Sequence, residues 1–180
     1  GMLKALSGPF PGMRFIPTGG IGPRNLSDYL SLPQVLACGG SWMVPETLLE
    51  QQDWTGLEAL ADSAVRTMLN TRFRHVGVNC PSDAAAETAR LFACLLGAAS
   101  DETPVSYFVG SDVEVMKDMG RGSMGHLAFS VSDIERAERY FTARGFCFDQ
   151  SSRKVDGAGR TTFLYFKNEL GGFAVHLVRA

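Results

Sequence analysis

The sequence predicts an α+β protein in two parts, a short β/α segment followed by two β-α-β-β-β modules. Two observations support this prediction. The hydrophobic pattern changes near residues 70–72, and beyond that point a strand, a helix and further strands follow one another twice. His75 and His126 occupy matching positions in the two copies. A repeat of this length that occurs only twice predicts paired modules, because a solenoid needs at least three repeats.

The first segment, residues 2–70, shows the order strand, helix, strand, helix, which predicts parallel β/α units. We expect short buried strands at 14–17 and 35–38, and helices at 25–30 and 57–69. The last helix has apolar residues at a spacing of 3.6, which favours one buried face. Those residues are Leu57, Leu60, Ala61, Ala64, Val65 and Met68.

The two modules span about 72–119 and 123–180. Each opens with a strand that carries a histidine and continues with a helix, which we expect at 83–96 and 133–144. The strand directly after each helix is weakly marked. The later strands show alternating patterns at 106–109, 113–116, 162–166 and 173–178.

The helix ends carry recognisable signals. Thr55 with Glu58, and Ser132 with Glu135, have the spacing of a capping box and predict two helix starts. Gly97 and Gly145 suit the C-terminal caps of the two module helices.

The chain has only three histidines, and all lie on predicted strands of the modules. His176 lies in the last strand of the second module, and its counterpart in the first module is Glu114. Strand alternation places these side chains on one face of the sheet, with valines and leucines on the other. The candidate metal ligands are His75, Glu114, His126 and His176.

Imidazole and carboxylate groups together suit divalent zinc, iron, nickel, cobalt or manganese. A single histidine on a strand is more often a hydrogen-bonded residue with no ligand role. The joint placement of all three at equivalent positions favours the metal site over that alternative.

At these residues, the segment 72–180 resembles the vicinal-oxygen-chelate superfamily, which includes glyoxalases, dioxygenases and bleomycin-resistance proteins. The resemblance implies a cupped sheet of paired βαβββ modules, with a metal bound from the first and last strands of each. The family often has a glutamate where this chain has His176, at the end of the run Glu169–His176. This departure argues against glyoxalase-type chemistry, in which that glutamate also serves as a base. Some members of the family bind no metal.

Residues 2–69 resemble the C-terminal third of 2-keto-3-deoxy-6-phosphogluconate/4-hydroxy-2-oxoglutarate aldolase. The matching stretches are Lys4–Phe10, Arg14–Ile21 and Val35–Pro45. The resemblance implies an incomplete β/α segment of a TIM-type barrel, without the strand that carries the Schiff-base lysine. Phosphate-binding loops of such barrels match Thr18, Gly19, Gly20, Gly39, Gly40 and Ser41. Ordinary turn chemistry is the stronger interpretation of these glycine pairs.

Three functions remain open from the sequence. The first is a metal-binding domain that binds or acts on a small oxo or hydroxy acid; if it is an enzyme, it is a metal-dependent lyase, isomerase or dioxygenase. The second is a metal-free binding or regulatory module. The third is a lyase, an aldolase-family member that is inactive as this truncated chain.

Composition limits the partners. The net charge of −2, without a run of basic residues, gives no support for nucleic-acid binding. No apolar stretch reaches the roughly 20 residues needed to span a bilayer. We expect a cytoplasmic protein whose partner is a small-molecule ligand. We also expect a homo-oligomer, because an incomplete β/α segment leaves open strand edges.

Overall fold

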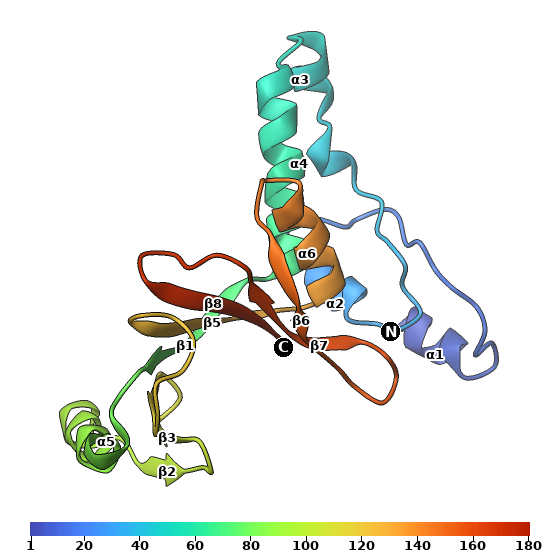
Figure 1. Ribbon diagram of the computed structural model, residues 1–180. Coiled ribbons are helices and arrows are strands. Elements are labelled where there is room, and N and C mark those ends of the chain that lie inside the picture. Colours follow the sequence, from blue (N-terminus) through green and yellow to red (C-terminus); the bar gives the residue numbers. More distant parts are fainter. The chain divides into compact units, whose positions relative to one another are not determined.

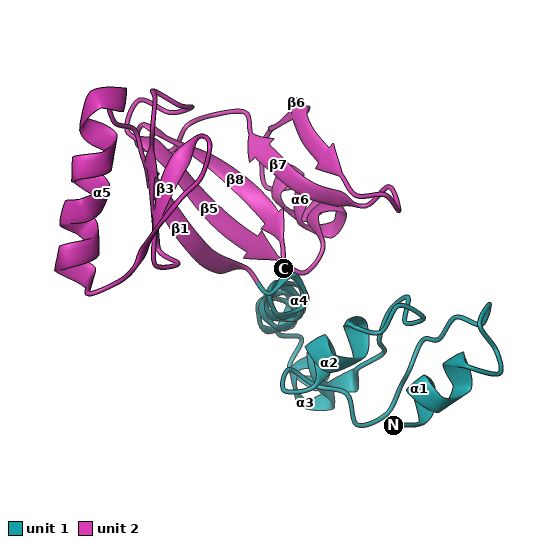
Figure 2. Ribbon diagram, turned by 90° about the horizontal axis from the view of Figure 1, so that it is seen from below, with its two compact units in different colours: residues 1–70 teal, residues 71–180 magenta.

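The computed structural model describes all residues from 1 to 180, and the chain divides into two compact units. Unit 1 comprises Gly1–Asn70 and unit 2 comprises Thr71–Ala180 (Figures 1 and 2). Each unit is described by itself. None of the helices is both long enough and apolar enough to cross a membrane.

The regular elements of unit 1 are all helices. Leu69, Ala64, Val35, Leu26 and Ile21 are its buried apolar residues. Its elements are α1 (Met2–Ser7), α2 (Leu26–Leu30), the short 3₁₀ helix η1 (Ser41–Met43), α3 (Glu46–Glu50) and α4 (Trp54–Leu69).

The prediction of buried strands at 14–17 and 35–38 is wrong, because only a single parallel bridge joins these segments, between Phe15 and Val35. Val35 is buried, but Ile16 and Leu36 are 61% and 52% exposed. Two short segments with no further strand beside them gain too little burial to form a ladder. The expected helix at 25–30 is present as α2, one residue shorter at its start.

Helix α4 begins earlier than predicted. The predicted capping box at Thr55 and Glu58 does not form. Instead, the Asp53 carboxylate caps the helix by accepting a hydrogen bond from the Gly56 N–H at 2.9 Å. Asp53 satisfies one of the free N–H groups of the first turn. Asn70 ends the helix in the left-handed conformation.

Unit 2 contains one cupped sheet (Figure 2). Its eight strands have the order β2-β3-β4-β1-β5-β8-β7-β6. In each module the first strand pairs in parallel with the last, and the remaining pairings are antiparallel. The modules meet where β1 and β5 pair antiparallel. This topology confirms the predicted paired βαβββ modules. The first module has β1 (Arg72–Val78), α5 (Ser82–Leu96), β2 (Ser100–Glu102), β3 (Ser106–Val109) and β4 (Val113–Met116), and the second has β5 (Gly125–Val131), α6 (Ile134–Thr142), β6 (Phe148–Val155), β7 (Thr161–Phe166) and β8 (Phe173–Arg179).

The two module helices cover one face of the sheet. Helix α5 packs against β3 and β4, while α6 packs against β7 and β8 (Figure 2). Val113 and Val115 of β4 lie in the core beneath α5, with Ala85 and Ala89 from the helix. The alternating valines therefore face the helices, which leaves the opposite face of each strand for other side chains.

The end of α5 is as predicted, with Gly97 left-handed at φ 61°. The capping box predicted at Ser132 and Glu135 does not form at the start of α6. Asp133 is the cap, and its carboxylate accepts from the Arg136 N–H at 2.8 Å. The α6 helix ends at Thr142, before the predicted stop at Gly145.

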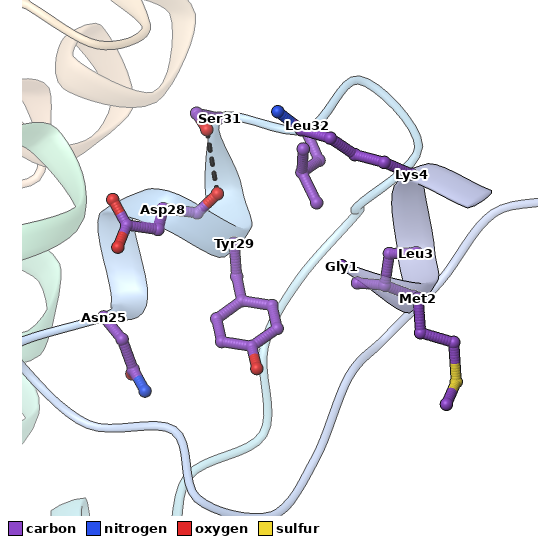
Figure 3. A pocket seen from close by; sticks show the side chains of 9 residues that line it. All are labelled: Gly1, Met2, Leu3, Lys4, Asn25, Asp28, Tyr29, Ser31 and Leu32. Atoms are coloured by element: carbon purple, nitrogen blue, oxygen red, sulfur yellow. Dashed lines mark hydrogen bonds between the residues drawn. The ribbon is translucent and has the colours of Figure 1, made fainter. Parts of the chain in front are cut away.

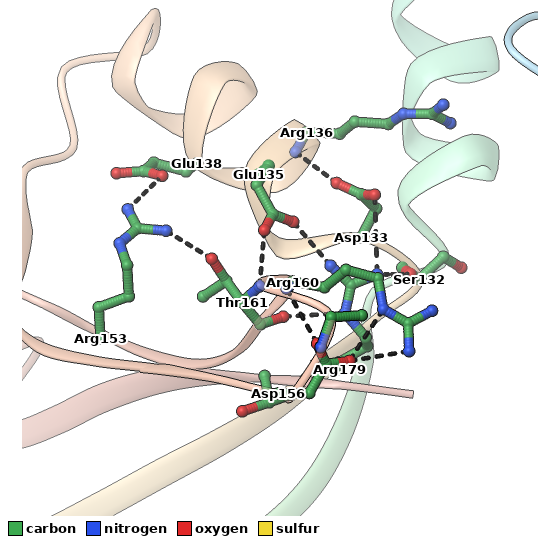
Figure 4. Close-up of polar contacts among 12 residues, drawn as sticks. Ser132, Asp133, Glu135, Arg136, Glu138, Arg153, Asp156, Arg160, Thr161 and Arg179 are labelled. Atoms are coloured by element: carbon green, nitrogen blue, oxygen red, sulfur yellow. Dashed lines mark hydrogen bonds and ion pairs between the residues drawn. The ribbon is translucent and has the colours of Figure 1, made fainter.

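Glu135 instead joins α6 to the sheet. Its carboxylate accepts from the Thr161 N–H at 2.6 Å and from Arg179 Nη2 at 2.7 Å (Figure 4). Arg153 of β6 makes a second link, to Glu138 of α6 at 2.7 Å and to the Thr161 hydroxyl at 2.7 Å (Figure 4). These charged hydrogen bonds fix the helix against β6, β7 and β8.

Candidate metal centre

The register of the sheet gathers the four predicted ligands on the face away from the helices. Gly77 of β1 lies opposite both Glu114 of β4 and His126 of β5. Ala128 of β5 lies opposite both His75 of β1 and His176 of β8. Residues directly opposite one another share a face, so the four ligands surround two small residues.

The four side chains converge. Glu114 Oε2 lies 3.1 Å from His126 Nε2 and 3.2 Å from His75 Nε2. The two Nε2 atoms are 3.1 Å apart. His176 joins the group, since the three histidines offer ligand atoms within 4.8 Å of one another.

Hydrogen bonds alone do not satisfy this triangle of atoms. If both imidazoles donate from Nε2 to Glu114, two N–H groups face each other across 3.1 Å. If one of them accepts instead, its lone pair faces the carboxylate oxygen. An ion at the centre would accept all three lone pairs. Atoms about 3.1 Å apart have the spacing of neighbouring ligands at roughly 2.1–2.2 Å from one metal.

His176 is the most enclosed member of the group, at 4% exposure. Its Nδ1 atom is buried and has no hydrogen-bond partner. Burial, reinforced by the neighbouring His126 and His75 rings, lowers the pKa of His176 to about 3. The imidazole is therefore neutral at physiological pH, which is the form that binds metals.

Glu114 is held in its charged form. Burial alone would raise its pKa, but hydrogen bonds from His126, His75 and Ser106 outweigh burial and hold the pKa well below its ordinary value. Ser106, fully buried at the start of β3, was not predicted from the sequence. A serine in a short strand gives no signal of its own.

Gly77 is a second residue that the sequence did not reveal. A Cβ atom at this position would overlap the His126 ring. The absence of a side chain at Gly77 thus makes room for an imidazole from the neighbouring strand. The repeat could have suggested this, because Gly77 and Ala128 are the small residues two positions after each strand histidine.

Aromatic rings surround the histidines. Phe108 of β3 contacts His75 edge-on, with ring centroids 5.4 Å apart. Phe163 and Tyr165 of β7 lie 4.6 and 4.9 Å from the His176 ring. Burial raises the pKa of Tyr165. The polar cluster therefore has apolar surroundings, which strengthen its electrostatic interactions.

The weaker phosphate prediction concerns two loops of unit 1. Gly19 and Gly20 have φ of 82° and 67°, which favours glycine whatever the loop binds. The Gly39 N–H donates to the Pro17 carbonyl at 3.0 Å, and Trp42 packs closely on Gly40. These contacts agree with turn chemistry, and phosphate binding at Thr18–Gly20 and Gly39–Ser41 stays a prediction.

A separate hollow of about 590 Å³ lies between α1 and α2, lined in part by Lys4, Asp28 and Tyr29 (Figure 3). None of the predicted phosphate-loop residues lines it. Lys4 is one basic group beside one acidic group there, which gives no preference for an anion.

The fold and the cluster define unit 2 as a paired-βαβββ domain with a three-histidine, one-glutamate site. The two units are similar to different groups of known proteins. Residues 1–60 match the family model of KDPG and KHG aldolases, which confirms the resemblance of the N-terminal segment.

Curated aldolases match the same segment. A 2-dehydro-3-deoxy-phosphogluconate aldolase of Pseudomonas aeruginosa is 47% identical over 73 residues, covering 41% of this chain and 33% of the relative. The KHG/KDPG aldolase of Escherichia coli K12 is 52% identical over 63 residues, covering 35% of this chain and 30% of the relative. The chain thus spans about a third of the length of the curated relatives it matches.

Solved structures match the other part of the chain. A methylmalonyl-CoA epimerase in complex with methylmalonyl-CoA and NH4+ is similar with a TM-score of 0.46 and 14% identity, over 61% of this chain and 94% of its own. The methylmalonyl-CoA epimerase of Mycobacterium tuberculosis has a TM-score of 0.43 and 14% identity, over 62% and 89%.

Proposed function

We propose that unit 2 binds one divalent first-row metal ion through His75, Glu114, His126 and His176, and with it a small oxo or hydroxy acid. The observation that carries the proposal is the triangle of donor atoms 3.1–3.2 Å apart, which hydrogen bonding leaves unsatisfied. The buried, unpartnered Nδ1 of His176 supports it. Rigid strands hold the ligands, which favours an accurately placed site.

A metal held there would act as a Lewis acid that polarises two adjacent oxygen atoms of a bound acid. The chain's own residues position and enclose that acid. Phe108, Phe163 and Tyr165 supply apolar walls beside the histidines, and such surroundings restrict the access of water.

The acid class draws support from unit 1. The curated relatives of residues 1–60 are aldolases of a 2-dehydro-3-deoxy acid by name. We infer that a domain joined to such a segment in one chain acts on or binds the same kind of metabolite. We propose a small oxo or hydroxy acid on this ground.

The test measures metal content by mass spectrometry after dialysis of the full chain against trace divalent metals. Wild type should retain about one ion per chain. His126→Ala and the isosteric Glu114→Gln should each lose most of it, because each removes one donor from the triangle. Cys94→Ala is the matched control, since Cys94 is exposed on α5 and should leave the content unchanged.

Circular dichroism shows whether each variant retains its fold. A folded wild type that retains no metal would favour the metal-free binding module instead. Equal losses in His126→Ala and Cys94→Ala would place the metal elsewhere.

A further inference from the structure

Lys154 is a cation near the histidine cluster, and its ammonium group has no hydrogen-bond or ion-pair partner. Lys154 of β6 pairs with Phe163 of β7, so the two side chains lie on the same face of the sheet. The same face carries Tyr165 and His176, which pair across β7 and β8. The register therefore places Lys154, on the edge strand β6, on the same face of the sheet as the predicted ligands.

The ammonium group is folded back over the sheet. Lys154 Nζ lies 5.0 Å from the centroid of the Phe163 ring. That ring in turn stacks on His176, with centroids 4.6 Å apart and an interplanar angle of 35°. The ammonium and the His176 ring thus both lie beside the Phe163 ring, and a cation in this position is attracted by the ring face.

The other cations on rings of this sheet are neutralised. Arg121 lies over Tyr165 and pairs with Asp149 at 2.7 Å. Lys117 lies over Tyr107 and pairs with Glu102 at 2.6 Å. The Lys154 ammonium makes no hydrogen bond or ion pair with the chain. Its charge is therefore available to a bound ligand.

From this geometry we infer that Lys154 is a specificity-determining residue that binds a second anionic group of the acid held at the histidine cluster. The inference rests on the proposed function. It names the substrate class as a small dianionic acid, with an oxo or hydroxy acid at one end and a further carboxylate or phosphoryl group at the other.

Charge balance leads to the same class. A divalent ion, the Glu114 carboxylate and the Lys154 ammonium would together carry a net charge of +2. A dianionic acid neutralises this charge, whereas a monoanionic acid leaves the exposed Lys154 ammonium without a counterion. Lysine binds carboxylate and phosphoryl groups alike, as a point charge.

The test compares three probes by calorimetry on the full chain loaded with Co2+. 2-Oxoglutarate carries a second carboxylate, 2-oxovalerate has a methyl group in its place, and 3-phosphonopyruvate carries a phosphonate. Wild type should bind one of the dianionic probes roughly tenfold more tightly than 2-oxovalerate, as expected of a charged hydrogen bond. Whichever of 2-oxoglutarate and 3-phosphonopyruvate binds more tightly identifies the second anionic group as a carboxylate or a phosphoryl group.

Lys154→Met should abolish this preference while 2-oxovalerate binding and cobalt content stay unchanged. Lys154→Arg should restore most of it. Lys117→Met is the matched control, because that lysine also lies over a ring but is paired with Glu102, and it should keep the preference.

Cobalt content measured in the same samples separates the two proposals. A cobalt-loaded wild type that binds all three probes equally would overturn the role of Lys154 alone. Equal loss of preference in Lys117→Met and Lys154→Met would also overturn it, since the effect would then be one of general charge. A chain that holds no cobalt at the four ligands would overturn the proposed function and this inference together.

Discussion

Gly77 shows how one missing side chain shapes the site. It lies between Glu114 and His126 in the register, and the His126 ring occupies the space that a Cβ would need. The strand conformation itself does not require glycine there, because Gly77 is absent from the positive-φ residues. The requirement is steric and comes from the neighbouring strand.

Gly77→Ala should therefore displace the His126 ring. We expect the loss of most bound metal and a destabilisation of about 1–3 kcal/mol, as for overpacking of a close-packed site. Metal content and urea denaturation measure the two effects. Gly157→Ala is the control, because a Cβ at that position meets no other atom. Full metal retention in a folded Gly77→Ala variant would contradict the steric role.

The four candidate ligands were predicted from a simple regularity in the sequence. All three histidines and Glu114 stand at equivalent strand positions of the repeat, and alternation assigns them one face. The contributions of Gly77 and Ser106 were not predictable in the same way. They depend on which strands lie side by side, and on contacts between residues far apart in the sequence.

At the scale of elements, Glu135 is both a first-turn residue of α6 and an anchor to the sheet (Figure 4). Burial alone would raise its pKa. Hydrogen bonds from Thr161 and the nearby charge of Arg179 instead lower the pKa to about 2. The charged form is thus favoured in the folded protein.

Glu135→Gln should lower the stability of the domain by about 1 kcal/mol near neutral pH, an estimate reduced for the partial solvent exposure of the pair. A lowered folded pKa stabilises the protein above the ordinary value of 4.5 and loses this effect as pH falls towards 2. The difference in the free energy of unfolding between wild type and variant should therefore shrink below pH 5 and vanish near pH 2. Urea denaturation across this range measures it, with the exposed helix residue Glu58→Gln as control. A difference that persists unchanged at pH 2 would show that the charge of Glu135 is not its source.

Helix starts were the least predictable feature of the elements. Both predicted capping boxes failed, and in each case a nearby aspartate caps the helix instead, Asp53 for α4 and Asp133 for α6. Serine, threonine and aspartate have similar capping preferences, so sequence alone does not choose between adjacent candidates. The glycine cap of α5 was predictable, because Gly97 readily adopts the left-handed conformation.

At the scale of the molecule, unit 1 resembles a family of enzymes but spans about a third of their length. We expect no aldolase chemistry from this chain, because none of its lysines matches the Schiff-base position of the resembled family. Its lysines are Lys4, Lys117, Lys154 and Lys167.

Incubation with pyruvate and borohydride, followed by mass spectrometry, should give no covalent adduct. A full-length aldolase serves as the positive control. A stoichiometric adduct on any lysine of the chain would overturn this expectation.

The architecture of unit 2 was predictable because its signals are local and occur twice. Alternation, helix periodicity and a matched histidine reinforce one another in both modules. In unit 1 the same kinds of signal predicted two buried strands where the structure has one bridge, between Phe15 and Val35. Strand formation there depends on neighbouring strands, and a pattern in the sequence does not guarantee them.

The junction of β1 with β5 is the only strand pairing that joins the two modules. Each module supplies two of the four donors, so neither half holds a complete site by itself. An ion bound there would cross-link the two modules, and separation of β1 from β5 would release it. Occupancy would then depend on the joined state of both halves, and saturation with metal would slow amide exchange along β1 and β5 together.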